Sequence, residues 1–192
     1  IVIGLLMGNM LRYVENVERA DVAVKICRID VNSAARNIRE MALNSDTSTY
    51  DSYQQQVETQ LAEVDSELKA DIVLADVPCS GYGVIGKKPE IKYRVTPQKQ
   101  EEIVILQRTI LDCAAEYVKP GGVLVFSTCT IAKEENEENM LWFMNNHPFK
   151  LESIDPYLPE ELHSETTALG YLQLLPGVHK TDGFFIAKFR RK

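Results

Sequence analysis

The sequence predicts an α/β fold: a mostly parallel sheet with an antiparallel hairpin at its edge. Segments with the spacing of strands alternate along the chain with segments that have the spacing of helices, the pattern of parallel sheets. The last two strand-like segments, residues 171–175 and 184–189, lie close together and are separated by Pro and Gly residues, which predicts the hairpin. The chain has 192 residues, of which 45% are hydrophobic and 26% charged, so we expect a single domain over residues 1–192.

The first part of the chain predicts one strand and two helices. Residues 23–29 are rich in β-branched side chains and end at Asp30, as a strand would. Residues 32–43 and 53–68 carry apolar side chains at helical intervals, and the second of these segments is amphipathic.

The remainder continues the same alternation. Pro78 stops a buried strand, Pro89 disfavours a helix around it, and Pro97 occupies the first turn of a long helix. Several glutamates at the start of a later helix suit the positive end of its dipole. The expected strands cover residues 71–77 and 123–127, the expected helices 97–118 and 134–146, and the expected extended loop 87–94.

Charge and composition exclude several classes of protein. The formal net charge of −7 argues against indiscriminate nucleic-acid binding, although residues 87–94 form a local basic segment. We expect no membrane span, because the apolar runs are short, and no signal peptide, because residues 1–10 lack a basic region and a cleavage site. The cysteines show no zinc-ligand spacing, so we expect no metal, and free thiols suit a cytoplasmic protein.

Two predicted strands end in sequences that each contain a cysteine. One ends Asp76-Val77-Pro78-Cys79, and the other ends Ser127-Thr128-Cys129. Ligands of parallel sheets bind beyond the carboxyl ends of the strands, so we expect Cys79 and Cys129 to face one cleft beside Asp76. A single cysteine at such a place is usually a packing residue. Two thiols and a carboxylate that converge there favour chemistry.

The other two cysteines fit the ordinary packing role. Cys27 lies inside a predicted strand, and Cys113 shares the apolar face of a predicted helix. The glycines of residues 81–86 match the dinucleotide-binding pattern, but Lys87-Lys88-Pro89 follows in place of a helix, so we reject a nicotinamide site.

Five motifs in order resemble the Sun/Fmu family of RNA (cytosine-5)-methyltransferases, and most closely its bacterial members that act on 16S ribosomal RNA. The motifs, listed in order, are Asp-Val-Pro-Cys-Ser-Gly, Lys-Lys-Pro-Glu-Ile-Lys-Tyr, Lys-Pro-Gly-Gly-Val-Leu-Val-Phe-Ser-Thr-Cys-Thr, Glu-Glu-Asn-Glu-Glu-Asn and Thr-Asp-Gly-Phe-Phe-Ile-Ala-Lys-Phe. The resemblance implies a Rossmann-like class I methyltransferase fold that uses S-adenosyl-L-methionine. It also implies RNA, with ribosomal RNA foremost, as the partner.

The resemblance assigns roles to the residues at the strand ends. Cys129 would attack carbon 6 of the cytosine, which makes carbon 5 nucleophilic enough to take the methyl group. Cys79 would assist release of the product, and Asp76 would contact the cytosine or the cofactor near its methyl group.

The resemblance also indicates the binding residues. Asp30 would hold the cofactor ribose, Asp51 would approach its adenine, and Asp76 would contact it near its methyl group. Pro78 would also belong to the cofactor site. The basic residues that would contact RNA phosphates are Lys87, Lys88, Lys92 and Arg94.

Residues 71–192 carry the motifs and form the expected catalytic half, whereas residues 1–70 resemble the family poorly. The Ala-Pro-Gly-Gly-Lys cofactor loop of the family is not found in this sequence, so we expect an incomplete or diverged cofactor half. We expect the isolated chain to bind S-adenosylmethionine weakly or not at all. One alternative is a catalytically silent RNA-binding or scaffold domain. Another is a redox protein that uses Cys79 and Cys129 as a dithiol, which the lack of a Cys-x-x-Cys pair disfavours.

Overall fold

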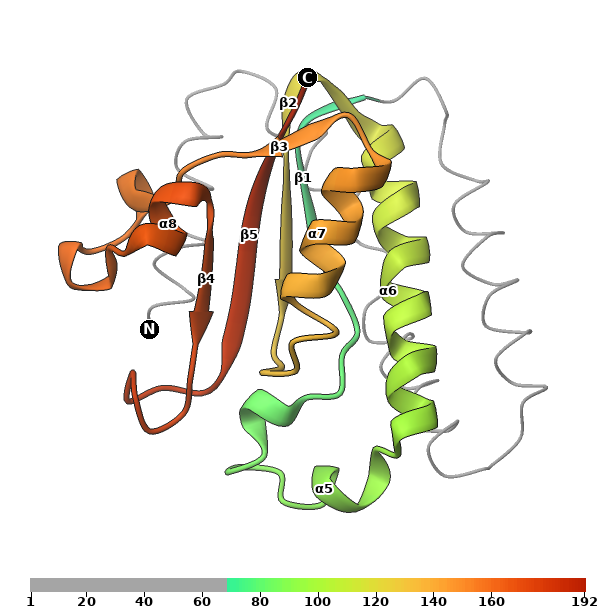
Figure 1. Cartoon of the computed structure of the whole chain (residues 1–192), viewed down its shortest axis with the longest axis vertical. Coiled ribbons are helices and arrows are strands. Elements are labelled where there is room, and N and C mark those ends of the chain that lie inside the picture. Colours follow the sequence, from blue (N-terminus) through green and yellow to red (C-terminus); the bar gives the residue numbers. More distant parts are fainter. Residues whose placement is uncertain (1–68) are drawn as a thin grey trace.

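The computed structural model describes residues 69–192, which form a sheet with two long helices packed on one face (Figure 1). The strand and the two helices expected over residues 23–68 lie outside the described residues. The strands are β1 (Ala70–Asp76), β2 (Val118–Thr128), β3 (Phe149–Leu151), β4 (Tyr171–Leu174) and β5 (Phe184–Arg191). The helices are α5 (Ile91–Arg94), α6 (Pro97–Tyr117), α7 (Glu137–Asn146) and α8 (Glu165–Leu169), and three short 3-10 turns are η1 (Tyr82–Val84), η2 (Asp155–Tyr157) and η3 (Glu160–Leu162).

The sheet joins a parallel part to an antiparallel part. β1 and β2 are parallel neighbours, and β5 runs antiparallel to β2 on the other side. The far edge of β5 pairs with both β3 and β4, so the expected hairpin of β4 and β5 is confirmed. Helices over a mixed sheet of this kind confirm the α/β fold class.

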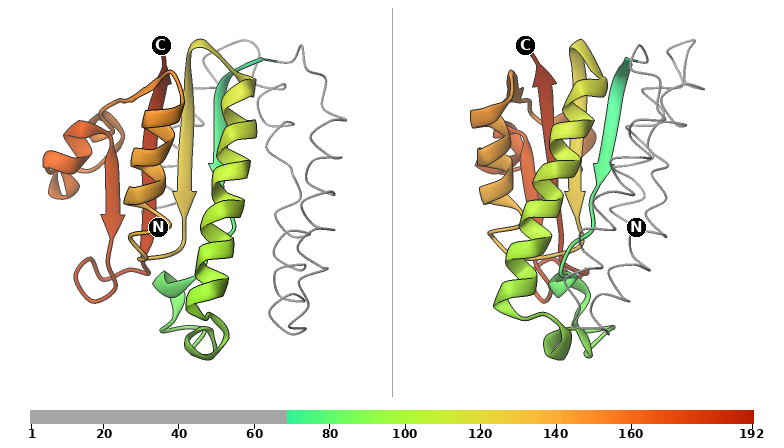
Figure 2. Two further views of the ribbon diagram at one scale, coloured as in Figure 1. Left: turned by 45° about the vertical axis from the view of Figure 1, so that its right-hand side comes forward. Right: turned by 90° about the vertical axis from the view of Figure 1, so that its right-hand side faces the viewer.

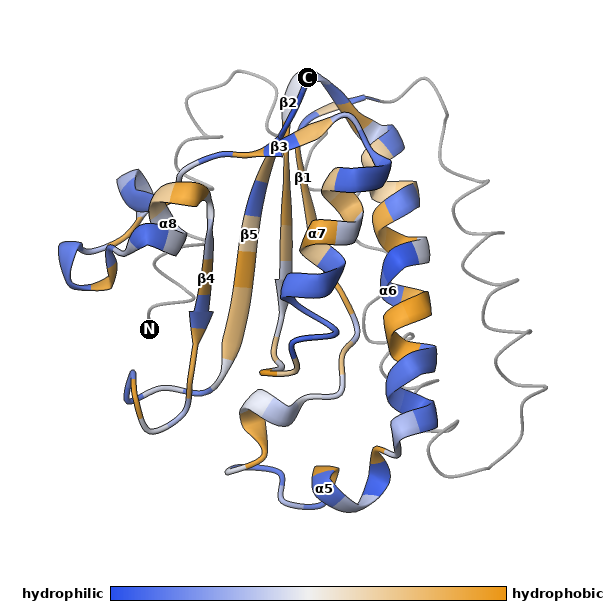
Figure 3. Ribbon diagram, viewed as in Figure 1, coloured by the Kyte–Doolittle hydropathy of each residue, from blue (hydrophilic) through white to orange (hydrophobic). Residues whose placement is uncertain are grey.

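The central strands are buried on both faces, which explains their nearly continuous apolar sequences. On β2, Leu124 and Phe126 point to the face covered by α6 and α7, whereas Val123 and Val125 point to the opposite face. Figure 2 shows both helices on the same side of the sheet. Figure 3 shows apolar residues along β2 and β5 and an alternation of polar and apolar residues along α6 and α7. Because alternate side chains of the strands are buried in two separate apolar clusters, the face to which each side chain near the strand ends points is fixed.

The element boundaries differ from the sequence predictions at three places. The expectation of an extended loop over residues 87–94 is wrong at its end, where α5 forms; Pro89 precedes this helix, so its missing N–H breaks no helical bond. α7 begins at Glu137, after a turn that takes up the first residues of the expected helix. β2 begins at Val118, and residues 119–122 form an irregularity where its pairing with β1 shifts between Ala70 and Ile72.

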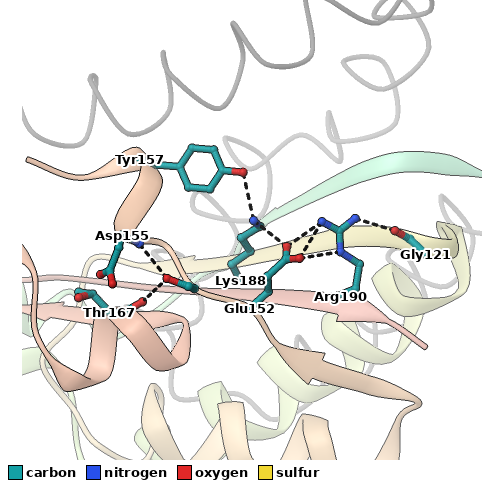
Figure 4. A network of polar contacts seen from close by, with 8 residues as sticks. Gly121, Glu152, Asp155, Tyr157, Thr167, Lys188 and Arg190 are labelled. Carbon is teal, nitrogen blue, oxygen red and sulfur yellow. Dashed lines mark hydrogen bonds and ion pairs between the residues drawn. The ribbon is translucent and has the colours of Figure 1, made fainter.

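An ion-pair network ties β5 to the segment after β3 (Figure 4). Lys188 is 4% exposed, and its Nζ lies 2.7 Å from Glu152 Oε2 and 3.1 Å from the Tyr157 hydroxyl. Arg190 donates to both oxygens of Glu152, and its Nη1 donates to the Gly121 carbonyl at 2.7 Å. The Glu152 carboxylate therefore neutralises the buried ammonium of Lys188 and binds the Arg190 guanidinium in a bidentate interaction.

Glu152 gives the fold a dependence on pH. Burial alone would raise its pKa, but the hydrogen bonds from Arg190 and Lys188 outweigh burial and lower the pKa below its ordinary value. A carboxyl whose pKa is lower in the folded state stabilises the fold above its unfolded pKa, and that stabilisation is lost as the pH falls through its folded pKa.

We expect Glu152→Gln to lower the free energy of unfolding at pH 7 by about 1–3 kcal/mol, because it leaves the charge of Lys188 without its carboxylate. The difference from the unsubstituted protein should shrink as the pH falls below about 4.3, the ordinary value for glutamate. Urea unfolding at pH 7 and at stepwise lower pH measures both effects. Glu138→Gln, which removes the same charge at an exposed position on α7, is the control. If the difference in unfolding free energy between Glu152→Gln and the unsubstituted protein stays constant with pH, the link between the pKa of Glu152 and stability is wrong.

Candidate active site

The ends of β1 and β2 lie side by side because the two strands are parallel and in register. Asp76 is paired with Ser127, and the Val77 N–H continues the pairing by donating to the Ser127 carbonyl at 3.1 Å. Both chains then leave the sheet at the same edge (Figure 1), so the residues that follow the two strands approach one another.

The two thiols at this edge are in direct contact. Sγ of Cys79 and Sγ of Cys129 lie 3.1 Å apart, both side chains are half-buried, and neither forms a disulfide. At this distance the two sulfur atoms share one proton in a hydrogen bond. The convergence expected from the strand ends is present in the structure.

The surroundings of the two thiols favour Cys79 over Cys129 as the holder of the shared proton. The hydrogen bond to Cys129, burial, and the nearby charges of Cys129 and Glu135 raise the pKa of Cys79 well above its ordinary value. The hydrogen bond from Cys79 lowers the pKa of Cys129; burial and the charge of Asp76 oppose this, while the charge of Lys88 supports it. Cys129 is therefore the more acidic of the two thiols and the one that ionises first, and a thiolate is the reactive nucleophilic form of cysteine.

Asp76 lies at the same edge, at the end of β1. Its Oδ1 accepts a hydrogen bond of 2.8 Å from the Ser127 hydroxyl. Partial desolvation by the surrounding protein raises the pKa of Asp76, and the bond from Ser127 lowers it in part. Its second oxygen can accept a hydrogen bond from an ammonium or amino group of a ligand.

A buried polar network holds the turn that carries Cys79. The Ser80 N–H donates to Glu135 Oε2 at 2.8 Å, and the Ser80 hydroxyl is hydrogen-bonded to Thr130 Oγ1 at 2.7 Å. Nε2 of Gln107, on α6, donates to the Pro78 carbonyl at 2.9 Å and to Glu135 Oε2 at 3.2 Å. The residues on both sides of Cys79 are thereby fixed to α6 and to the chain after β2.

Two glycines allow three segments of backbone to meet beside Cys129. The Gly83 N–H donates to the Cys129 carbonyl at 3.1 Å, and the Gly183 N–H donates to the Gly83 carbonyl at 2.8 Å. A Cβ on Gly83 would lie 2.3 Å from the Gly183 carbonyl oxygen and 2.7 Å from the Cys129 carbonyl oxygen. This part of the glycine-rich segment forms the 3-10 turn η1 and opens no α-helix, as expected when we rejected a nicotinamide site.

The basic segment lies directly after this turn. The side chains of Lys87, Lys88, Lys92 and Arg94 are exposed. Lys87 forms an ion pair of 2.5 Å with Asp182, and Lys92 lies over the Tyr93 ring at 4.6 Å. Lys88 is near enough to Cys129 to lower its pKa, which places positive charge at the mouth of the thiol site.

A set of buried polar residues next to the thiols is not predicted by the sequence pattern. The glutamates of residues 134–138 are typical of the solvated start of a helix, but Glu135, Asn136 and Asn139 are fully buried. Asn136 accepts from Thr128 Oγ1 at 2.6 Å, and it donates to the Thr130 carbonyl at 3.0 Å. The available signal was the four-residue spacing of Asn139 and Phe143, which places this amide in line with the buried Phe143 on α7.

Asp30, Asp51 and Cys27 lie outside the described residues, so their expected roles stay predictions. Cys113 is half-buried on α6. Within residues 69–192, no group of three or more His, Cys, Asp or Glu side chains could hold a metal ion. None of the helices in that part of the chain has the length and apolar character needed to cross a membrane.

Comparison with known proteins gives matches along most of the chain. Residues 10–190 match the family model described as 16S rRNA methyltransferase RsmB/F. The match begins within the first 70 residues, where the sequence motifs showed little resemblance, so the family similarity covers more of the chain than its motifs do.

Two relatives and one solved structure agree with this family. The chain is 43% identical over 124 residues to the probable ribosomal RNA small subunit methyltransferase B of Bacillus subtilis, covering 64% of this chain and 28% of the relative. It is 37% identical over 123 residues to ribosomal RNA small subunit methyltransferase F of Cronobacter sakazakii, covering 63% of this chain and 25% of the relative. The crystal structure of NSun6 from Pyrococcus horikoshii with SFG is similar with a TM-score of 0.56 and 32% identity, covering 69% of this chain and 32% of that one. The chain thus spans about a quarter of the length of the two relatives.

We expect Gly83→Ala to destabilise the protein by about 1–3 kcal/mol, the usual cost of overpacking, because its Cβ would press on two backbone carbonyls. Gly86→Ala is the matched control, since a Cβ there has no atom within 4 Å. Urea unfolding of the two variants measures the difference. Equal stability of both would mean that the backbone contact beside Cys129 is loose.

Proposed function

The chain belongs to the 16S rRNA methyltransferase RsmB/F family, and on that premise we propose that it forms the catalytic half of an RNA (cytosine-5)-methyltransferase. The proposed reaction transfers a methyl group from S-adenosyl-L-methionine to carbon 5 of a cytosine. The proposed substrate is ribosomal RNA, which the names of the relatives give as theirs.

The observation that carries the proposal is the contact of 3.1 Å between Cys79 and Cys129, whose hydrogen bond raises the pKa of Cys79 and lowers that of Cys129. Carbon 5 of cytosine is a weak nucleophile in the intact ring. Addition of the Cys129 thiolate to carbon 6 breaks the double bond between carbons 5 and 6 and gives an enamine, whose carbon 5 can form a bond to the methyl group. Cysteine suits this step because its thiolate is both a strong nucleophile and a competent leaving group.

Cys79 is proposed to act at the end of the reaction. Once carbon 5 carries the methyl group, its remaining proton must leave so that the double bond re-forms and the Cys129 thiolate departs. Cys79 lies next to Cys129. It is proposed to accept the carbon 5 proton as a thiolate, after its own proton has passed to water during the earlier steps. Two neighbouring thiols in different protonation states thus suit the two halves of the reaction.

Asp76 and Pro78 are the described residues proposed to border the cofactor. Asp76 fits the role because it lies at the carboxyl end of a parallel strand, where ligands of such sheets bind, and has an oxygen free of the bond to Ser127. Bound S-adenosylmethionine would supply the electrophilic methyl group. Asp30 and Asp51 are proposed to hold its ribose and adenine. The NSun6 structure with SFG, an analogue of S-adenosylmethionine, supports this cofactor for the family.

The basic segment is proposed to contact the RNA backbone. Its exposed cations lie beside the turn that follows Cys79, and their charge would attract phosphates on either side of the reacting nucleotide. The cytosine must leave any base stack before Cys129 can reach carbon 6. The proposed RNA-contacting residues are Lys87, Lys88, Lys92 and Arg94.

We expect Cys129→Ala to abolish methylation in the full-length protein, because no other group can form the bond to carbon 6. Cys79→Ala should trap the protein on RNA, because addition and methyl transfer proceed while elimination stalls. A denaturing gel with substrate RNA and S-adenosylmethionine would show this adduct as a slowly migrating band.

Cys113→Ala, at a half-buried thiol on α6, is the control and should leave methylation unchanged. A covalent band with Cys129→Ala, and none with Cys79→Ala, would reverse the roles of the two thiols. Full activity in both variants would show that the thiols are packing residues.

A further inference from the structure

Glu135 is a buried carboxylate that the proposed reaction does not use directly. Its side chain is fully buried, and burial raises its pKa, while the bonds from Ser80 and Gln107 lower it in part. Oε2 accepts from both of these donors, whereas Oε1 has no hydrogen-bond partner among the described residues. Keeping a carboxylate in such a place is costly, so its position calls for a reason beyond packing.

The contacts of Glu135 and Gln107 lie on both sides of Cys79. Glu135 binds the N–H of Ser80, the residue after Cys79, and Gln107 binds the carbonyl of Pro78, the residue before it. Asn139 donates to Gln107 Oε1 at 2.6 Å, which turns the Gln107 amide so that its NH₂ group faces Glu135 and Pro78. The turn that presents Cys79 is therefore set by a chain of contacts that centres on Glu135.

The charge of Glu135 also acts on the thiol pair. Its negative charge raises the pKa of Cys79, which opposes ionisation of that thiol. The charged groups that face Cys129 are Asp76, which raises its pKa, and Lys88, which lowers it. Glu134, the acidic neighbour of Glu135, is exposed, and its charge raises the pKa of Glu135. Cys79 thus faces the negative charge of Glu135, whereas the charges that face Cys129 oppose one another, with Asp76 acting more strongly than Lys88.

We propose that Glu135 is a positioning residue that fixes the Pro78–Ser80 turn and, through its buried carboxylate next to that turn, keeps the shared proton on Cys79 so that Cys129 ionises first. Its meaning for catalysis rests on the proposed function, since only that function needs Cys129 to attack. The position of the proton is a property of the protein alone and can be measured without RNA or cofactor.

The test is alkylation of the full chain by iodoacetamide, which reacts with thiolates, with mass spectrometry to locate the modified cysteine. At pH 7 the unsubstituted protein should react at Cys129 in preference to Cys79. Glu135→Gln keeps the shape of the side chain and removes its charge, so the ratio of Cys129 to Cys79 modification should fall by about threefold or more, as for half a pKa unit. Glu135→Asp, which keeps the charge, should retain the preference for Cys129.

Glu134→Gln is the matched control, because it removes the same charge from the adjacent exposed position and should leave the ratio unchanged. If Glu135→Gln does not fold, Gln107→Met decides the question. It removes a donor that lowers the pKa of Glu135, and so should shift the ratio in the same direction by a smaller factor. An unchanged ratio in a folded Glu135→Gln protein, or in Gln107→Met when the first variant is unfolded, would overturn the proposal.

The outcome is separable from that of the proposed function. A shifted ratio in a protein that methylates no RNA would uphold the role of Glu135 in placing the proton and remove only its catalytic meaning. A methyltransferase whose ratio is insensitive to Glu135 would uphold the reaction and refute this role.

Discussion

The parallel pairing of β1 with β2 is the constraint on which the candidate site depends. Because Asp76 lies opposite Ser127, the residues that follow the two strands leave the sheet at the same edge and at the same level. A slip of one residue would turn the side chains of one strand to the other face. Burial of both faces of β2 by separate apolar clusters makes such a slip costly, so the core of the sheet specifies the distance between the thiols.

The polar network around Glu135 adds what the strand register cannot supply. The strand register brings the two thiols together, but it does not distinguish them chemically, because each thiol simply follows the end of a strand. The difference between them comes from their surroundings: the charge of the buried Glu135 acts on Cys79, whereas the opposing charges of Asp76 and Lys88 act on Cys129. In such a site, identical side chains acquire different protonation states because of the groups that surround them.

The sequence predicted the parts of the fold that local pattern controls. The apolar runs at residues 71–77 and 123–127 and the hairpin strands are present within a few residues of their expected bounds, because burial on both faces requires such runs. It missed β3 and α8, which are three and five residues long and depend on pairing with β5 and on the Ser164 cap. The approach of Cys79 to Cys129 followed from the rule for parallel strand ends. The burial of Glu135 did not, because glutamates at the start of a helix ordinarily face water and only the tertiary contact with Ser80 and Gln107 reverses this.

The position of β5 in the sheet has a consequence for how the protein reaches its native state. β5 lies between β2 on one side and β3 and β4 on the other, yet it follows all of them along the chain. Until β5 docks, β2 keeps one edge of unpaired backbone N–H and C=O groups flanked by apolar side chains, the kind of edge that recruits strands from other molecules. Pairings between segments so distant in sequence form slowly, since a long loop must close first. We therefore expect the interval before β5 inserts to be the time at which this protein is most prone to aggregate.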